Sequence, residues 1–156
     1  MYNPNDFERF PVRKHPRMKH FDYSSCNYYF VTICTHDKKC IFGKPGENNN
    51  FRDIAEQGLL RIPEHFPDTT IEKFVVMPNH VHILLLLSGG KSSLGNIIGT
   101  WKAYVTREIH KIQPDLKVWQ ASFHDHIIRN EDGYQKIWLY IEGNPMNWKQ
   151  DCFYLT

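Results

Sequence analysis

Residues 71–87 read IEKFVVMPNHVHILLLL, and the fold can be worked out from this stretch. Apolar and β-branched residues fill both of its halves, which is typical of two strands, 71–77 and 80–87. Pro78 and Asn79 stand between the halves, and both residue types favour a tight turn. We therefore predict a β-hairpin here.

The segments around the hairpin predict one strand before it and a second one after it. Residues 27–35 (NYYFVTICT) are β-branched and aromatic, as in a strand. Residues 118–128 indicate a short strand or an extended stretch. Residues 44–50 (KPGENNN) have the composition of a loop.

Apolar residues at helical spacing predict three helices, over residues 51–65, 94–112 and 131–143. Gly58 weakens the first, Ser92 or Ser93 can cap the second, and Asn130 can cap the third. The second helix would bury one stripe: Ile98, Trp101, Val105, Ile109 and Ile112. The resulting order of elements predicts an α+β fold, an antiparallel β-sheet flanked by helices.

The composition indicates one globular domain over residues 1–156, since 41% of the residues are hydrophobic and 23% are charged. A net charge of +2 does not by itself indicate a nucleic-acid-binding protein. Basic residues nevertheless gather in residues 1–20, an extended arm that contains Arg13, Lys14, Arg17 and Lys19. This basic arm can bind DNA phosphates or can be a solvated tail, and the sequence leaves both readings open.

Four cysteines are present, none of them in a CxxC pair. The chain shows no secretory signal, and its longest apolar run is too short to cross a bilayer. We therefore expect free thiols, a cytoplasmic location and no membrane partner.

His80 and His82 form the strongest candidate site for chemistry. Alternate residues of a strand share one face, so both imidazoles should point the same way, while Val81, Ile83 and Leu85 should point into the opposite layer. Two imidazoles on one face can bind a divalent metal ion. Two solvent-facing histidines are the alternative, and the apolar strand around them favours the metal site.

The stretch MPNHVHIL resembles the HUH motif of the IS200-like single-tyrosine transposases, and most closely of the REP-associated tyrosine transposases. The resemblance extends along the chain through the middle helix and continues in three later segments: Trp119-Gln120, residues 123–129 (FHDHIIR) and residues 140–145 (YIEGNP). It implies a ferredoxin-like HUH endonuclease fold. It also implies an enzyme that nicks and rejoins single-stranded, palindromic hairpin DNA through a 5′-phosphotyrosine intermediate, acting as a monomer or a homodimer.

The resemblance assigns the nucleophile to Tyr140, by its place before the Asn-Pro pair. Tyr134 is the rival, because periodicity does not separate the two. The resemblance also suggests Asn144, four residues after Tyr140, as the third ligand of a Mg²⁺ or Mn²⁺ ion held by His80 and His82. Asn144 can instead be a C-cap, because a residue before a proline tends to leave the helical region.

Other residues are candidates for contact with DNA. They are Lys102, Arg107, Trp119, Gln120 and Arg129. Lys102 and Arg107, on the middle helix, can simply face water, which is the commoner case. A tryptophan is more often buried than stacked on a base. His126, like Arg129, can be structural or face DNA.

Two other classes of function remain as alternatives. A catalytically silent DNA-binding protein would bind hairpins equally well with and without metal. A metal-dependent hydrolase would use water as its nucleophile and would need a carboxylate near the metal. Glu142 could approach such a site, but the HUH segment itself contains no carboxylate.

Overall fold

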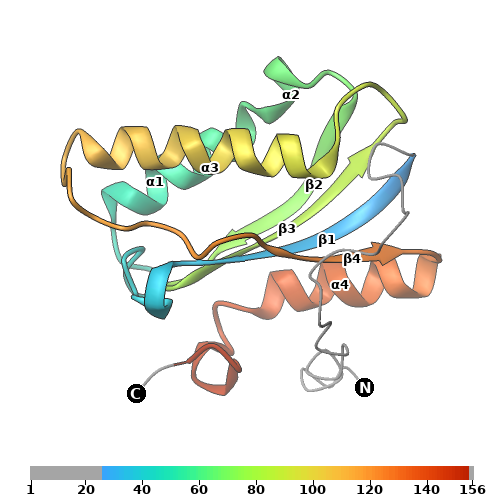
Figure 1. Ribbon diagram of the computed structural model, residues 1–156. Helices are drawn as coiled ribbons and strands as arrows, with labels where there is room; N and C mark the ends of the chain where they lie inside the picture. The colour runs from blue at the N-terminus through green and yellow to red at the C-terminus, as the bar shows by residue number, and fades with distance from the viewer. Residues whose placement is uncertain (1–25, 155–156) are drawn as a thin grey trace.

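A computed structural model describes residues 26–154 and places a four-stranded antiparallel sheet at the centre of this part of the chain (Figure 1). The strands lie in the order β2-β3-β1-β4. Their bounds are Asn27–Cys34 for β1, Thr69–Val76 for β2, His80–Leu87 for β3 and His124–Ile128 for β4. This is the strand order of a ferredoxin-like βαββαβ unit, so the predicted fold class is confirmed.

Helices cover both faces of the sheet (Figure 1). One face carries α1 (Asn50–Leu60), α2 (Ile62–His65) and α3 (Leu94–His110), and the other carries α4 (Glu131–Gly143). Two 3-10 turns, η2 (His36–Lys38) and η3 (Trp148–Gln150), lie outside these layers. The extra helix α4 therefore creates a second, smaller interior on the far side of the sheet.

Strand alternation divides the core between these two layers. Val81, Ile83 and Leu85 pack under α1 and α3 in the larger cluster, as predicted. Leu84 and Phe30 point the other way and pack against Ile137 and Ile141 of α4. Even-numbered residues of β3 thus face α4, and His80 and His82 belong to this set.

Side-chain caps fix where α3 and α4 begin. The Ser93 hydroxyl accepts a hydrogen bond from the N–H of Asn96, and the Asn130 side chain accepts one from Gly133. Each satisfies a backbone donor that has no partner inside its helix. Both predicted caps are confirmed, and the four cysteines are free, as expected.

Two helix ends differ from the prediction. The helix expected over 51–65 breaks at Arg61, because Pro63 has no N–H to continue the α1 ladder and instead occupies the first turn of α2. The second helix ends at His110 instead of continuing to residue 112. Ile112 therefore leaves the buried stripe and is 57% exposed.

Gly58 allows α1 to lie close to α3. A Cβ at this position would come within 2.8 Å of Cδ1 of Tyr104 and 3.1 Å of Cδ1 of Trp101. Gly58→Ala should therefore lower the free energy of unfolding by about 1–2 kcal/mol, because overpacking outweighs the roughly 1 kcal/mol gain in helix propensity. Gly99→Ala is the matched control, since nothing lies within 4 Å of its added methyl group.

Urea unfolding of the two variants measures this difference. We expect Gly99→Ala on α3 to raise the free energy of unfolding by about 0.5–1 kcal/mol. Equal stabilisation by both substitutions would mean that Gly58 lies farther from Tyr104 and Trp101 of α3 than the distances above indicate.

Candidate metal centre and active site

His80 and His82 lie side by side on the α4 face of β3. Their ring centroids are 4.6 Å apart, and the two residues are 0% and 2% exposed. His82 also stacks on Phe30 of the neighbouring strand, with ring centroids 5.2 Å apart. The prediction that the two imidazoles share one face is confirmed, and they are buried instead of facing solvent.

Each ring is held by a hydrogen bond at its Nδ1 atom. Nδ1 of His82 lies 2.8 Å from Oγ1 of Thr32, and Nδ1 of His80 lies 2.9 Å from Oδ1 of Asn79. A histidine held at one ring nitrogen can present the other to a metal ion. The Nε2 atoms of both rings therefore remain available on the side toward α4 and the C-terminal segment.

Burial keeps both rings neutral at pH 7. It lowers the pKa of His82 to about 3. Burial, reinforced by neighbouring His82, lowers the pKa of His80 well below its ordinary value, while the nearby side chain of Asn144 acts in the opposite direction. Neutral imidazole is the form that binds a metal ion.

A carboxylate from the C-terminal segment completes the cluster. Oδ2 of Asp151 lies 3.6 Å from Nε2 of His80, and the Asp151 side chain is 3% exposed. The ligand atoms of His80, His82 and Asp151 all lie within 4.8 Å of one another. The Asn144 side-chain oxygen is also buried and, within residues 26–154, has no hydrogen-bond partner.

These atoms are chemically suited to a cation. Nε2 of His80 likewise has no hydrogen-bond donor facing it among the described residues, so acceptors converge in one buried place. A buried carboxylate and buried lone pairs are costly unless a positive charge or donor meets them. Two imidazoles with carboxylate and amide oxygens form a mixed N/O donor set that suits a divalent metal ion.

Tyr140 of α4 points at this cluster. Its hydroxyl lies 3.5 Å from Nε2 of His82, and the two ring centroids are 5.2 Å apart. Tyr134, six residues earlier, instead donates a hydrogen bond to Oε2 of Glu72 at 3.0 Å. Burial and this carboxylate raise the pKa of Tyr134 to about 12. The two tyrosines thus have different surroundings, and of the two it is Tyr140 that contacts the histidine pair.

The family model for "Transposase IS200 like" matches residues 22–144, most of the chain. The protein belongs to the IS200-like transposase family. Family membership makes it a DNA-processing enzyme and connects it to DNA transposition.

The chain is also similar to two proteins of one organism and to a solved structure. The chain is 33% identical to an uncharacterized protein of Haemophilus influenzae, with 92% of this chain and 93% of that protein covered. It is 25% identical to a second protein of that organism, named "Putative REP-associated tyrosine transposase", with 80% and 73% covered. Among solved structures, it resembles a REP-associated tyrosine transposase bound to a REP hairpin, with a TM-score of 0.63, 18% identity and 87% and 74% covered.

Asn144 of this IS200-like transposase keeps helical geometry before Pro145. Its φ of −58° and ψ of −45° correct the expectation that the proline would move it out of the helical region. Pro145 removes one N–H, but Asn147 N donates to Gly143 O and continues the turn. Asn144 is therefore the C-cap of α4 and also lies beside the cluster, so the two readings do not exclude each other.

Two residues predicted to contact DNA are used in packing by this transposase. The Lys102 ammonium donates to the carbonyl oxygens of Gln120 and Ser122, at 2.9 Å each. The Trp119 indole donates to Lys102 O at 3.2 Å, and its ring packs against Trp101 at 5.0 Å between centroids. Trp119 thus has the commoner, packed role, and contact of Lys102, Trp119 and Gln120 with DNA remains a prediction.

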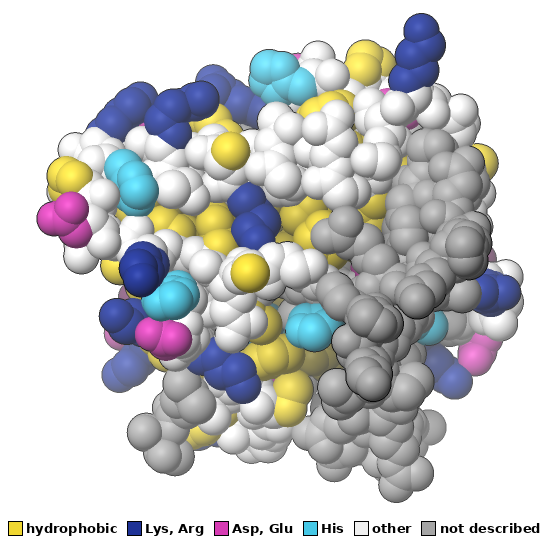
Figure 2. All heavy atoms as spheres, in the orientation of Figure 1, with side chains coloured by type: hydrophobic (Ala, Val, Ile, Leu, Met, Phe, Trp, Pro, Cys, Tyr) yellow, Lys and Arg dark blue, Asp and Glu magenta, His cyan; other side chains and the backbone are white. Residues whose placement is uncertain are grey.

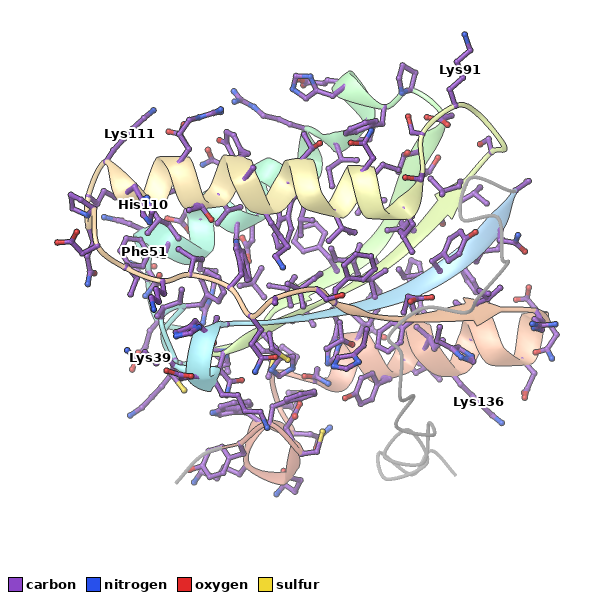
Figure 3. All side chains as sticks on the ribbon, viewed as in Figure 1. Lys39, Phe51, Lys91, His110, Lys111 and Lys136 are labelled. Carbon is purple, nitrogen blue, oxygen red and sulfur yellow. The ribbon has the colours of Figure 1, made fainter. Side chains whose placement is uncertain are left out.

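Arg107 and Arg129, two of the arginines predicted to contact DNA, are exposed. Arg107 lies on α3, across the sheet from the histidines, and Figure 2 shows Lys and Arg side chains over this end of α3. Arg129 is exposed just before α4. Lys136, labelled in Figure 3, extends from α4 away from the sheet and pairs with Asp132 at 3.0 Å. The basic arm, Arg13, Lys14, Arg17 and Lys19, lies outside the described residues.

Sequence reasoning missed Asp151 and assigned Asn79 only to a turn. Asp151 follows the last helix in a segment without periodicity, so spacing gave no signal for it. Glu142, the carboxylate considered from the sequence, pairs instead with Lys73 at 3.4 Å and is 60% exposed. None of the helices within residues 26–154 has the length and apolar composition to cross a membrane.

The buried histidines predict a stability that depends on pH. The folded-state pKa of His82, about 3, lies below its ordinary value of 6.5, so between these pH values the unfolded state binds more protons. Stability is therefore lost as the pH falls through this window, by roughly 3 kcal/mol at pH 4 for this ring, and His80 acts in the same direction.

Urea unfolding of the metal-free protein between pH 7.5 and 4 checks this dependence. The control is His82→Gln, which removes the titrating ring and should give a shallower slope of free energy against pH. Equal slopes for the two proteins would contradict the burial of a neutral His82.

Proposed function

We propose that this protein is a metal-dependent DNA endonuclease and strand transferase that nicks and rejoins single-stranded hairpin DNA through a 5′-phosphotyrosine intermediate. The observation that carries the proposal is the position of Tyr140, whose hydroxyl lies 3.5 Å from Nε2 of His82. A tyrosine hydroxyl beside a buried cluster of possible metal ligands is well suited to metal-assisted phosphoryl transfer to tyrosine.

His80 and His82 would hold the metal ion, with Asp151, Asn144 or both supplying oxygen ligands. Mg²⁺ or Mn²⁺ fits the oxygen ligands of such a set, because carboxylate and amide oxygens are hard ligands. When bound, the ion makes the scissile phosphate more electrophilic. Thr32 and Asn79 orient the two imidazoles for this role from the other side of the rings.

Tyr140 would attack the scissile phosphorus with its phenolic oxygen. A Tyr–O–P bond forms to the 5′ side of the break while the bond from phosphorus to the 3′-oxygen breaks. Tyr140 loses its phenolic proton, and the leaving 3′-oxygen gains one to become a hydroxyl. A second 3′-hydroxyl can attack the phosphotyrosine in the reverse sense, which rejoins strands without an external energy source.

Hairpin DNA is the proposed substrate. The solved relative is described as bound to a REP hairpin, and the family acts in transposition. Arg107, Arg129 and the basic arm are candidates for phosphate contacts, which give affinity while base contacts give specificity. The enzyme would act as a monomer or a homodimer.

A metal-dependent hydrolase is the second candidate, favoured by one observation. Asp151 supplies the carboxylate at the cluster that the HUH segment lacks, and a carboxylate can activate water. A hydrolase would cut DNA without forming a covalent bond to protein, whereas the proposed enzyme forms one in every turnover.

A denaturing gel distinguishes the two candidates. Labelled single-stranded hairpin DNA is incubated with the protein in Mn²⁺, in Mg²⁺ and in EDTA, beside a shuffled strand that cannot form a hairpin. We expect a slow-migrating covalent species only when the hairpin and one of the two metals are both present, and none in EDTA or with the shuffled strand. Cleavage without that species would favour the hydrolase. Intact DNA on the denaturing gel, with a shifted complex on a native gel, would favour a silent DNA-binding protein.

A further inference from the structure

Asn79, in the turn between β2 and β3, is fully buried, and both ends of its side-chain amide and its backbone oxygen lie within hydrogen-bonding distance of partners. Its side-chain Nδ2 donates to the carbonyl oxygen of Phe153 at 2.8 Å and to that of Lys38 at 3.2 Å. Its side-chain Oδ1 lies 2.9 Å from Nδ1 of His80. Its own backbone oxygen accepts two hydrogen bonds from Thr35. A turn alone does not need so many contacts.

These contacts fix the orientation of the Asn79 amide. The NH₂ group faces two carbonyl oxygens, so exchanging its N and O atoms would place oxygen against oxygen twice. Oδ1 must therefore face the His80 ring, where it can only accept. Nδ1 of His80 consequently carries the proton, and Nε2 carries the lone pair.

A competing acceptor makes this tautomer depend on Asn79. Oδ2 of Asp151 lies 3.6 Å from Nε2 of His80, where it could accept a proton placed on that nitrogen. Without Asn79, Nδ1 has no acceptor, so the neutral ring would return to the Nε2–H tautomer that histidine prefers in water; an Asp151 that stayed in place would favour the same tautomer. In that tautomer Nε2 has no lone pair to offer a metal ion.

Asn79 also holds the segment that carries Asp151. Phe153 accepts a hydrogen bond from Asn79 through its carbonyl oxygen and donates one from its N–H to Oδ1 of Asp151, at 2.8 Å. The Phe153 ring packs 4.5 Å from the His80 ring, between centroids. With Oδ1 engaged by Phe153, Oδ2 is the oxygen directed toward His80.

We propose that Asn79 is a positioning residue that prepares two metal ligands at once: it sets the tautomer of His80 and seats Asp151 at the same site. The inference rests on the proposed function only in taking this cluster as the metal site. One side chain thereby links the HUH segment to the C-terminal segment, 74 residues away along the chain.

Two substitutions separate the two roles. Asn79→Ala removes both, so the His80 proton should move to Nε2, and the affinity for Mn²⁺ should fall about 10- to 100-fold. Asn79→Asp keeps an acceptor facing Nδ1 but places a carboxylate oxygen against the carbonyl of Phe153. This variant should keep the His80 tautomer and release the segment around Asp151.

Three measurements read these effects without DNA. Nitrogen NMR of the imidazoles in the metal-free protein reports the His80 tautomer, and calorimetric titration with Mn²⁺ reports affinity. Limited trypsin cleavage after Lys149 reports whether the C-terminal segment is seated. Asn147→Ala is the matched control, since it removes another asparagine hydrogen bond, to Gly143 O, without contact to His80.

We expect the wild type and Asn147→Ala to carry the His80 proton on Nδ1, Asn79→Ala to carry it on Nε2, and Asn79→Asp to keep it on Nδ1 with faster cleavage at Lys149. A wild type protonated at Nε2, or an unchanged tautomer and Mn²⁺ affinity in Asn79→Ala, would overturn the inference. If the tautomers are as expected but the protein forms no DNA adduct, the inference about Asn79 holds and the proposed function is wrong.

Discussion

The Tyr140→Phe protein is expected to form no covalent DNA adduct and to cleave hairpin DNA at least about 10³-fold more slowly than the wild type. Loss of the hydroxyl removes the atom that would bond to phosphorus. The ring contacts with Phe30 and His82 remain, at 6.1 and 5.2 Å between centroids, so the fold should be kept. The denaturing gel measures adduct formation and cleavage, and a thermal melt checks that the fold is kept.

Tyr134→Phe is the matched control on the same helix. It also removes one tyrosine hydroxyl, but that hydroxyl donates to Glu72 and does not face the histidines. We expect adduct formation within about 3-fold of the wild type and a loss of about 1 kcal/mol in the free energy of unfolding. Loss of the adduct in Tyr134→Phe, with retention in Tyr140→Phe, would reverse the assignment of the nucleophile.

Removal of one imidazole should have an effect of similar size through the metal. His82→Ala deletes a central member of the cluster, so the affinity for Mn²⁺ should fall by about 10²-fold or more and the adduct should disappear. EDTA should have the same effect on the wild type. Calorimetric titration with Mn²⁺ and the denaturing gel test this together.

His124→Ala is the control for this substitution. His124, on β4, pairs with Thr32 of β1, and Thr32 also pairs with His82 of β3. The two histidines therefore lie in one row on the same face of the sheet. His124 is exposed and lies outside the cluster of possible ligands. Equal loss of Mn²⁺ affinity in both variants would place the metal elsewhere on that face.

The oxygen ligands can be ranked in the same titration. We expect Asp151→Asn to lower the affinity for Mn²⁺ more than Asn144→Ala, because it removes a negative charge from the site. The reverse order would make Asn144 the main oxygen ligand and give Asp151 a structural role.

The elements that define the fold were predictable because their signals are local. The apolar composition of β3 and the helical spacing in α3 and α4 can each be read within one segment, without information from distant parts of the chain. Two helix ends were predicted wrongly. Pro63 carries a local signal for the break in the first helix that the prediction did not use, and apolar spacing continues to Ile112 although α3 ends at His110. Gly58, a weakness by propensity alone, is explained by a contact with Tyr104.

The candidate site was half predictable for the same reason. His80 and His82 are neighbours on one strand, and Tyr140 and Asn144 are neighbours on one helix, so spacing places the members of each pair together. The choice of Tyr140 over Tyr134, and of Asn144 as a ligand, came from the family resemblance. Asp151 is held at the site by contacts such as those with Phe153, which Asn79 binds in turn, and no local pattern contains such contacts between distant parts of the chain. For Trp119 the sequence left packing and base stacking both open, and only the folded structure shows Trp101 beside it.

Mass spectrometry of the covalent adduct tests the central claim most directly. After nuclease and trypsin digestion, Tyr140 lies in peptide 137–149, where it is the one tyrosine, and Tyr134 lies in peptide 130–136. We predict a nucleotide phosphate attached to peptide 137–149, at Tyr140. A nucleotide on peptide 130–136, or cleaved DNA with neither peptide modified, would contradict the account.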